Sequence, residues 1–182
     1  NAISHRDYLH GGNIFIRQYP RRLTIESPGG FPLGITPGNI LDRQLPRNRR
    51  IADIFAKCGL VERSGQGMNL MFELSIKESK QTPDFTGTDP YQVFLHLNGE
   101  VQDPHFLQFL EKVGQETIAL FSTADFLLLD HINREQKVPD HLKNRLQSLV
   151  DKGVIERHGR GRGVKYILSR RYYEMVGEEG VY

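Results

Sequence analysis

The sequence predicts an α+β fold in two parts: a small sheet with helices over residues 1–98 and a helical domain ending in a hairpin over residues 99–182. Residues 13–19 and 23–27 alternate apolar and polar side chains, a pattern typical of paired strands. From residue 103 onward, apolar side chains recur at helical spacing instead. A chain of 182 residues with 38% hydrophobic positions is large enough for two small domains.

The first domain is expected to begin with a helix at Asn1 and to continue into the strand pair, whose turn is Pro20-Arg21-Arg22. Pro28-Gly29-Gly30 ends the second strand, because glycine adopts backbone angles that other residues avoid. A sheet backed by helices in this way is an α+β layer. The later elements are expected to be a short helix over residues 36–41, a helix from residue 48 to Gly59, an extended piece over 60–63, a helix over 68–77 and a strand over 91–97.

The second domain is expected to contain three helices and a hairpin. Asp103-Pro104 opens the first helix, and Ser122 caps the second. Pro139-Asp140 opens the third, which Gly153 ends. Strands at residues 154–155 and 164–168 pair across a glycine-rich turn, which completes the order typical of a winged helix. Because only three residues separate the second helix from the third, a full-length middle helix is expected to be missing or displaced.

The net charge of +2 conceals an uneven distribution along the chain. Residues 137–171 contain ten Lys or Arg against three acids, whereas residues 72–116 contain eight acids against three lysines. Charge governs encounter and non-specific binding rather than the choice of fold. The split therefore indicates where a partner binds.

Composition also excludes several functional classes. Cys58 is the only cysteine, which excludes an internal disulfide and a multi-cysteine zinc site, and no metal site is predicted. No apolar run approaches the ~18 residues of a membrane span, and no secretory signal begins the chain. We therefore expect a cytoplasmic protein with no membrane partner. Because the chain starts at Asn1 without a methionine, we also expect it to be a piece of a longer protein.

The glycine-rich turn and the helix before it predict a DNA interface. The third helix is apolar along one stripe and polar elsewhere, and such a helix fits the major groove of B-DNA. Glycines let the turn over residues 159–163 approach a backbone closely, where arginine suits phosphates or a narrow minor groove. The alternative is a solvated helix face with an ordinary hairpin. The residues predicted to contact DNA are Lys143, Asn144, Arg145, Arg157, Arg160, Arg162 and Lys165.

Four segments occur in order along the first domain: residues 1–8 (NAISHRDY), 27–32 (SPGGFP), 46–48 (PRN) and 59–67 (GLVERSGQG). Through them the chain resembles the divergent, ATPase-like C-terminal domain of bacterial RecG-related helicases and AlbA/Schlafen-type transcriptional regulators. The resemblance covers about residues 1–98 and implies a GHKL-like two-layer α/β sandwich, an AlbA-like domain upstream and a regulatory role. The rest of the chain is similar to the winged-helix tail that many members carry.

The resemblance also implies a nucleotide site. In GHKL-type ATPases a helix supplies a magnesium-binding asparagine, and later glycine segments surround the nucleotide. The matching residues here are Asn1, His5, Glu26, Gly30, Gly65 and Gly67. Glu26 stands where an adenine-reading aspartate is usual, and Pro28 stands where that segment's first glycine is usual. These departures predict a vestigial site that does not hydrolyse ATP, so no cofactor is expected, and ATP with Mg²⁺ stays the candidate ligand.

We therefore hypothesise a DNA-binding transcriptional regulator, in which the ATPase-like domain is a scaffold or sensor and the winged unit contacts double-stranded DNA. Regulators of this kind commonly read paired half-sites through two-fold symmetry, so a homodimer is expected. One alternative is a helicase-related, GHKL-like ATPase, although no Gly-Lys-Ser/Thr phosphate loop of a helicase motor is present. Another is a module that only binds a second protein.

Overall fold

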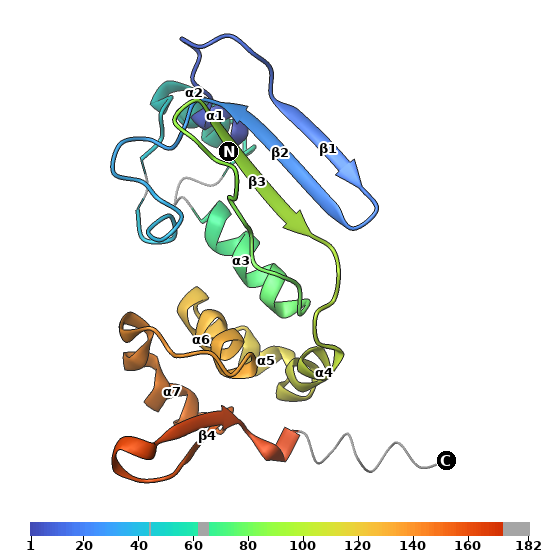
Figure 1. The fold of residues 1–182 in the computed structure, drawn as a ribbon, viewed down its shortest axis with the longest axis vertical. Coiled ribbons are helices and arrows are strands. Elements are labelled where there is room, and N and C mark those ends of the chain that lie inside the picture. Colours follow the sequence, from blue (N-terminus) through green and yellow to red (C-terminus); the bar gives the residue numbers. More distant parts are fainter. Residues whose placement is uncertain (44, 62–65, 173–182) are drawn as a thin grey trace. The chain divides into compact units, whose positions relative to one another are not determined.

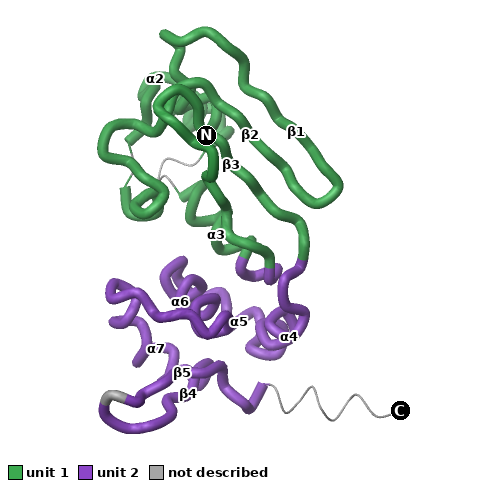
Figure 2. Tube along the Cα trace, viewed as in Figure 1, with its two compact units in different colours: residues 1–75, 80–100 green, residues 76–79, 101–182 purple. Residues whose placement is uncertain are grey.

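The computed structural model describes residues 1–43, 45–61 and 66–172, and the chain forms two compact units (Figure 2). Unit 1 comprises residues 1–75 and 80–100, and unit 2 comprises residues 76–79 and the chain from residue 101 onward. Helices and strands both occur in the described residues, and the sheets are open (Figure 1). The predicted α+β class is therefore confirmed.

Unit 1 contains a three-stranded antiparallel sheet in the order β1-β2-β3. Its strands are β1 (Phe15–Tyr19), β2 (Arg22–Pro28) and β3 (Gln92–Asn98). Ile25 of β2 pairs with Ile16 of β1 and with Leu95 of β3, so these three apolar side chains share one face. All three strands were predicted to within two residues, because the alternation that specifies a strand is visible in the sequence.

Three helices belong to unit 1 in whole or in part. They are α1 (Ala2–His5), α2 (Arg49–Lys57) and α3 (Gly67–Lys77), whose last residues belong to unit 2. α1 packs on both β2 and α2. Residues from all three helices line one cavity together with the sheet face of Ile16, Ile25 and Leu95, so helices and sheet form two layers.

The helix predicted over residues 36–41 is absent, and the structure has a series of turns there. The side chain of Asn39 accepts a hydrogen bond from the backbone N–H of Thr36 at 2.8 Å and donates to the carbonyl of Gly34 at 2.9 Å. Local bonds of this kind compete with the helical ladder, and Gly38 weakens it further. Of the extended piece predicted over 60–63, residues 60 and 61 form a bend, and 62–63 lie outside the described residues.

Unit 2 begins with helices whose starts are capped as the sequence predicts. α4 (Pro104–Val113) starts after Asp103, whose carboxylate accepts hydrogen bonds from two backbone N–H groups of the first turn. α5 (Gln115–Ile118) follows, and α6 (Thr123–Asn133) starts with a reciprocal capping box between Ser122 and Asp125. Satisfying these donors fixes where each helix begins.

The core of unit 2 is a single cluster of aromatic and aliphatic side chains. Burying each of the larger ones contributes about 1.5–3 kcal/mol of transfer free energy. The core therefore holds the helices and the hairpin as one body. Its most deeply buried members, at most 1% exposed, are Ile76, Phe106, Phe109, Phe126, Leu128, Leu129, Leu149, Val154 and Ile155.

The third helix of unit 2 differs from the uniform α-helix expected between Pro139-Asp140 and Gly153. The structure has a 3-10 helix, η1 (Asp140–Arg145), that runs directly into α7 (Leu146–Asp151). The change falls at Arg145, whose guanidinium is bonded to Asp125 in α6. After α7, β4 (Ile155–His158) and β5 (Lys165–Leu168) pair antiparallel around the 3-10 turn η2 (Gly161–Gly163).

No helix within the described residues has the length and apolar character needed to cross a membrane.

Candidate functional site

Three of the four motif segments meet at α1. The Oγ atom of Ser27 donates to the carbonyl of Ala2 at 3.1 Å. The side-chain amide of Asn48 donates to the carbonyls of Ser4 and Arg6, at 3.0 and 2.7 Å. A helix of one turn leaves its last carbonyls without intrahelical partners, and Asn48 satisfies two of them. These motif residues therefore build the local fold around the site.

Arg47 joins the same segments through its guanidinium. Nη1 donates to Oδ2 of Asp7 at 2.9 Å, and Nη2 donates to the carbonyl of Gly30. The pKa of Asp7 is lowered, chiefly because the backbone N–H of Leu9 donates to it and because His10 does the same, with Arg47 adding its charge. Asp7 is therefore an anion engaged by neighbours of its own unit.

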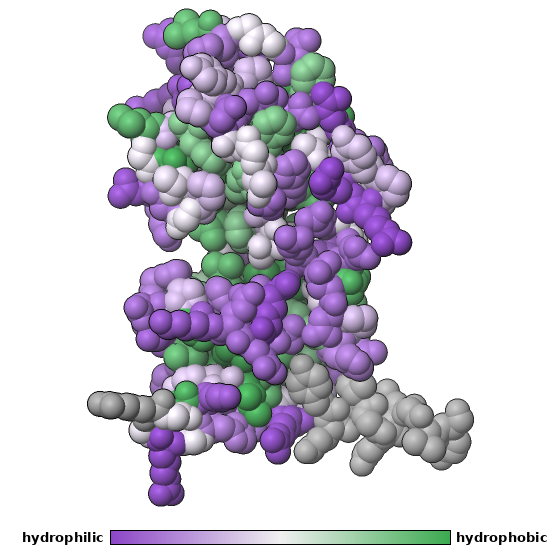
Figure 3. Space-filling model, in the orientation of Figure 1, coloured by the Kyte–Doolittle hydropathy of each residue, from purple (hydrophilic) through white to green (hydrophobic). Residues whose placement is uncertain are grey.

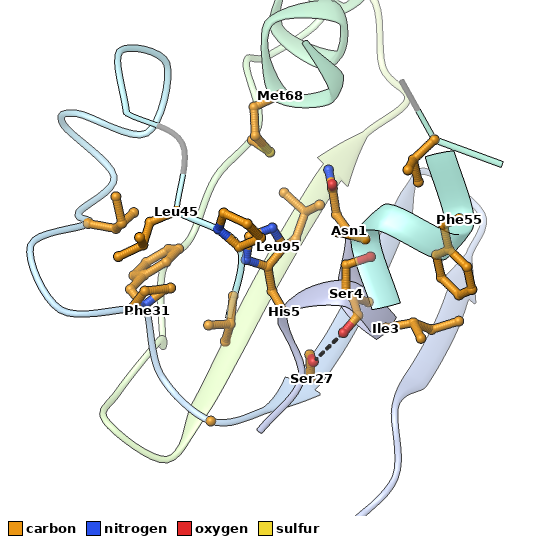
Figure 4. Close-up of a pocket in the computed structure, with 18 of the residues that line it drawn as sticks. Asn1, Ile3, Ser4, His5, Ser27, Phe31, Leu45, Phe55, Met68 and Leu95 are labelled. Atoms are coloured by element: carbon orange, nitrogen blue, oxygen red, sulfur yellow. Dashed lines mark hydrogen bonds between the residues drawn. The ribbon is translucent and has the colours of Figure 1, made fainter. Parts of the chain in front are cut away.

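A cavity of about 1250 Å³ lies between the sheet and the helices of unit 1. Its lining is largely apolar and comes from every part of the unit. Figure 4 shows Phe31 and Leu45 on one side, Phe55 on the other and Met68 reaching in from α3, with His5 between them. An apolar cavity with a few convergent polar groups is the usual form of a small-molecule site.

Several polar side chains stand among these apolar walls, and Asn1, Ser4 and His5 are the ones that come from the first segment of the chain. Burial lowers the pKa of His5, and the positive charge of Arg47 lowers it further. The imidazole is therefore neutral at pH 7 and can both donate and accept one hydrogen bond. Ser4 is 4% exposed, and its Oγ atom has no hydrogen-bond partner within the described part of the chain. Both groups can bind a polar atom of a ligand.

The structure brings several of the predicted nucleotide-binding residues together. Asn1, His5 and Gly30 line the cavity. Gly67 opens α3, and a Cβ at this position would lie 3.1 Å from Nδ2 of Asn1. Gly65 lies outside the described residues. These predicted residues therefore lie on one side of the cavity.

The backbone of Gly30 has a different role from the one predicted. Its N–H donates to the carbonyl of Pro90 at 2.9 Å, and that of Gly29 donates to the carbonyl of Tyr91. A Cβ at Gly30 would lie 2.6 Å from the carbonyl oxygen of Asp89. Glycine is therefore required because two backbone segments touch, and this N–H is already engaged within the fold.

Glu26 is not among the residues that line the cavity, in contrast to its predicted role. Neighbouring residues of a strand point to opposite faces. Ile25 and Ser27 line the cavity, and Glu26 lies on the other face. There its Oε1 accepts a hydrogen bond from Nε of Arg17 at 2.6 Å, and its Oε2 accepts one from Gln92 at 3.4 Å. The sequence alone does not show which residues of β2 face the cavity, because this depends on how the strand pairs with its neighbours.

The basic hairpin of unit 2 places its cations at the surface. Arg157, Arg160 and Lys165 are exposed, and the side chain of Arg162 lies outside the described parts. Gly159 has φ +87°, and a Cβ there would lie 2.5 Å from the carbonyl oxygen of Gly163. This close approach brings the two arms of the turn together, so the glycine is needed for the shape of the hairpin.

The helical residues predicted to read DNA fall into two groups. Lys143 and Asn144 are exposed, and Nζ of Lys143 lies 2.6 Å from a carboxylate oxygen of Asp140. Arg145 is instead bonded through Nε and Nη2 to both oxygens of Asp125, which is fully buried. Its guanidinium therefore stabilises unit 2, and this differs from the base-reading position expected from the sequence.

Two acidic residues that the sequence analysis did not single out hold unit 2 together. Asp125 stands three residues after the cap Ser122, a capping-box spacing that is visible in the sequence. Glu156 accepts hydrogen bonds from Oγ of Ser169 and the backbone N–H of Arg170, and these lower its pKa. No local pattern signals Glu156, because its partners lie 13 and 14 residues away.

The described residues contain no group of three or more His, Cys, Asp or Glu side chains placed to hold a metal ion.

Residues 11–97 match the family model described as "Putative ATP-dependent DNA helicase recG C-terminal". The matched segment contains all three strands of the sheet and both α2 and α3. This part of the chain is therefore similar to the ATPase-like RecG C-terminal family, which agrees with the resemblance predicted from the sequence. The AlbA/Schlafen relationship and the winged-helix tail stay predictions.

Among solved structures, the DIP2311 protein from Corynebacterium diphtheriae has a similar fold, with a TM-score of 0.74 and 24% sequence identity over 96% of this chain. The chain spans 40% of the length of that protein. At this identity the likeness establishes the fold alone. No curated protein matches the sequence.

Proposed function

We propose that unit 2 binds double-stranded DNA through its basic hairpin and the η1–α7 segment, and that the ATPase-like domain serves as its scaffold or sensor in a transcriptional regulator. The observation that carries the proposal is the exposure of Arg157, Arg160 and Lys165 on one short hairpin. The hairpin packs on the helices of its own unit, β4 on α7 and β5 on α6. A rigid base of this kind holds the cations in a fixed arrangement.

The two parts of the surface suit different features of a duplex. Arginine and lysine on the hairpin can neutralise phosphates, which fixes position without reading sequence. On the helix, Leu146 and Leu149 are buried, whereas Lys143, Asn144 and Gln147 are exposed. Exposed amide and amino groups on a helix can reach base edges in the major groove. Hairpin residues are therefore assigned to affinity and helix residues to sequence preference.

The test is titration of a fluorescently labelled duplex at several salt concentrations with Arg160→Ala/Arg162→Ala. This double variant should weaken binding to all sequences and reduce the slope of log affinity against log salt by about one for each phosphate that is no longer neutralised. Arg50→Ala/Lys57→Ala removes two cations from α2 of unit 1 and serves as the charge-matched control. Equal binding by the hairpin variant and the wild type would refute the proposal.

Symmetry supplies a second test of the same proposal. A regulator that reads paired half-sites binds them as a two-fold dimer, with half-sites about one helical turn apart. We therefore propose that the chain forms a homodimer. Light scattering at tens of micromolar should give twice the 20.9 kDa chain mass. A monomer mass, both without and with duplex DNA, would refute the proposed homodimer.

Nucleotide binding without turnover is a second candidate function, favoured by the meeting of Asn1 and His5 at a cavity beside the start of α3. Backbone N–H groups at a helix start favour phosphate. A fluorescent ATP analogue should bind the chain and be displaced by ATP, and Met68→Glu should weaken binding because it places a negative charge in the cavity beside the start of α3. Analogue binding that is unchanged in this variant would place the nucleotide elsewhere.

A further inference from the structure

The outer face of the unit 1 sheet, opposite the cavity, presents aromatic side chains to solvent. Phe15 and Tyr19 of β1 are 43% and 46% exposed, with Arg17 between them in the strand. Residues two apart on a strand share one face at a spacing of about 6.8 Å. The two rings therefore stand on the same surface, about 13 Å apart.

Each ring is paired with an arginine. The guanidinium carbon of Arg17 lies 4.9 Å from the ring centroid of Phe15, and that of Arg22 lies 5.1 Å from the ring centroid of Tyr19. Arg17 is held by its hydrogen bond to Glu26, whose side chain is 12% exposed. We call the four residues Phe15, Arg17, Tyr19 and Arg22 the stacking face.

The stacking face carries excess positive charge. Residues 15–22 contain three arginines and no acid. Two carboxylates approach from neighbouring segments, and each is bonded to an arginine: Glu26 to Arg17 and Glu100 to Arg21. Figure 3 shows strongly hydrophilic side chains gathered over the turn end of this hairpin. A second copy of the chain would bring like charges together, so an anionic occupant fits this surface better.

Alternating aromatic and arginine side chains on an open sheet suit one class of anion, single-stranded nucleic acid. Aromatic rings stack on base faces and arginines neutralise the backbone between them. A duplex offers no exposed base faces except at its ends, so it cannot use the rings. An acidic peptide would satisfy the arginines and leave the rings without a specific partner.

We propose that the stacking face binds single-stranded DNA, with successive bases on Phe15 and Tyr19 and phosphates beside Arg17 and Arg22. This site is on a different unit from the proposed duplex interface and takes a different form of nucleic acid. Binding of single-stranded DNA would explain the exposed aromatic side chains of β1. An edge strand usually carries charged side chains instead, which prevent association with other chains.

The test uses an oligothymidylate of about 12 nucleotides, a length within the usual site size of one binding domain. Its 5′ end carries fluorescein, and anisotropy is measured with the full chain bearing Arg160→Ala/Arg162→Ala, which weakens the basic hairpin. Adding Phe15→Ala/Tyr19→Ala should reduce affinity by about tenfold for each ring removed. Tyr91→Ala removes a ring that is 72% exposed but lies outside the stacking face, and it should leave affinity unchanged.

Competition with duplex DNA and a comparison of DNA with RNA distinguish single-stranded DNA from the other nucleic acids that could bind the stacking face. Unlabelled duplex of the same length should displace the oligothymidylate poorly, because its bases are already stacked. Oligouridylate that binds tenfold more tightly than oligothymidylate would identify RNA as the occupant and overturn the assignment to DNA. Equal affinity of the Phe15→Ala/Tyr19→Ala and parent proteins, or no binding at low salt, would also overturn it.

Photocrosslinking keeps the proposal testable if the double variant fails to fold. An oligothymidylate containing 5-iodouracil is irradiated with the otherwise unchanged chain, and the crosslinked peptide is identified by mass spectrometry. The crosslink should fall on Phe15 or Tyr19. A crosslink confined to residues 155–168 would assign single-strand binding to the basic hairpin and refute the stacking face.

Discussion

Arg145 donates two hydrogen bonds to Asp125, from Nε to Oδ1 at 2.9 Å and from Nη2 to Oδ2 at 2.7 Å. The carboxylate is fully buried and also closes the capping box at Ser122. One side chain therefore fixes the start of α6 and, through Arg145, the junction between η1 and α7. Because α7 packs on β4, this pair positions the helix that precedes the basic hairpin.

Arg145→Ala is expected to lower the free energy of unfolding by about 3 kcal/mol, since it leaves a buried carboxylate without its ionic partner. Lys143→Ala removes a neighbouring ion pair that is exposed to solvent, and it should leave the free energy of unfolding nearly unchanged. Urea denaturation followed by circular dichroism measures both. Similar stabilities for the two variants would show that the Asp125 contact contributes little.

The same pair predicts acid sensitivity. Burial acts to raise the pKa of Asp125, but hydrogen bonds from Arg145 and Ser122 outweigh it and hold the pKa below its ordinary value. A carboxyl with a lowered folded-state pKa contributes its full stability above the unfolded value, about 3.9, and loses it as pH falls through the folded value. Stability should therefore decline below about pH 4. Asp125→Asn should flatten this decline, and an unchanged profile would assign it to other carboxyl groups.

The strands could be predicted because their signal is local. Phe15–Tyr19 and Gln92–Asn98 alternate along the sequence, and turn residues bound them. The helix predicted over 36–41 failed for an equally local reason, because the side chain of Asn39 bonds to the backbone on both sides of the predicted helix start. Sequence patterns of this kind report propensity and do not show which of two local hydrogen-bond schemes wins.

The candidate site was predicted less completely because it depends on register and long-range contacts. Asn1 and His5 reach the cavity because their four-residue spacing places them on one helix face. Glu26 stands in β2 between two residues that line the cavity. Its own side chain lies on the opposite face of the sheet, because neighbouring residues of a strand point to opposite faces. Arg145 was assigned to DNA because it lies off the apolar stripe of its helix, and its partner in the structure, Asp125, lies 20 residues earlier in the sequence. No pattern in the sequence connects those two positions.

Gly30→Ala tests whether this glycine serves packing or phosphate binding. An added Cβ would lie 2.6 Å from the carbonyl oxygen of Asp89 and 2.8 Å from Cα of Pro90, so the variant should lose about 1–3 kcal/mol of stability. Gly11→Ala is the matched control, because no atom lies within 4 Å of its added Cβ. Full stability of Gly30→Ala together with loss of ATP-analogue binding would instead support the phosphate role.

Lys143→Ala and Asn144→Ala should alter the sequence preference of duplex binding without flattening its salt dependence. Their side chains are exposed on the helix before the basic hairpin, and a good base contact is worth about 1–3 kcal/mol of discrimination. Selection from a randomised duplex pool compares each variant with the wild type. Arg50→Ala serves as the control, because it removes an exposed cation from α2 of unit 1. Identical selected sequences for every variant would exclude base reading by this helix.

The chain is expected to show no appreciable ATP turnover. Glu26, in the place of the usual aspartate, faces away from the cavity and is bonded to Arg17. The N–H of Gly30 is bonded to Pro90, so this segment offers the nucleotide neither the expected carboxylate nor that backbone donor. Hydrolysis needs groups positioned on the attacking water and on the transferred phosphoryl group. Release of phosphate with Mg²⁺ present should therefore equal the protein-free rate.

Two variants decide whether any observed turnover belongs to this cavity. Asn1→Ala removes the residue expected to bind magnesium, and Glu26→Gln removes the displaced carboxylate while keeping its size. Phosphate release that is abolished by Asn1→Ala and retained in Glu26→Gln would mean that the cavity hydrolyses ATP by groups other than the usual acid. Release unaffected by either change would be traced to a contaminating enzyme.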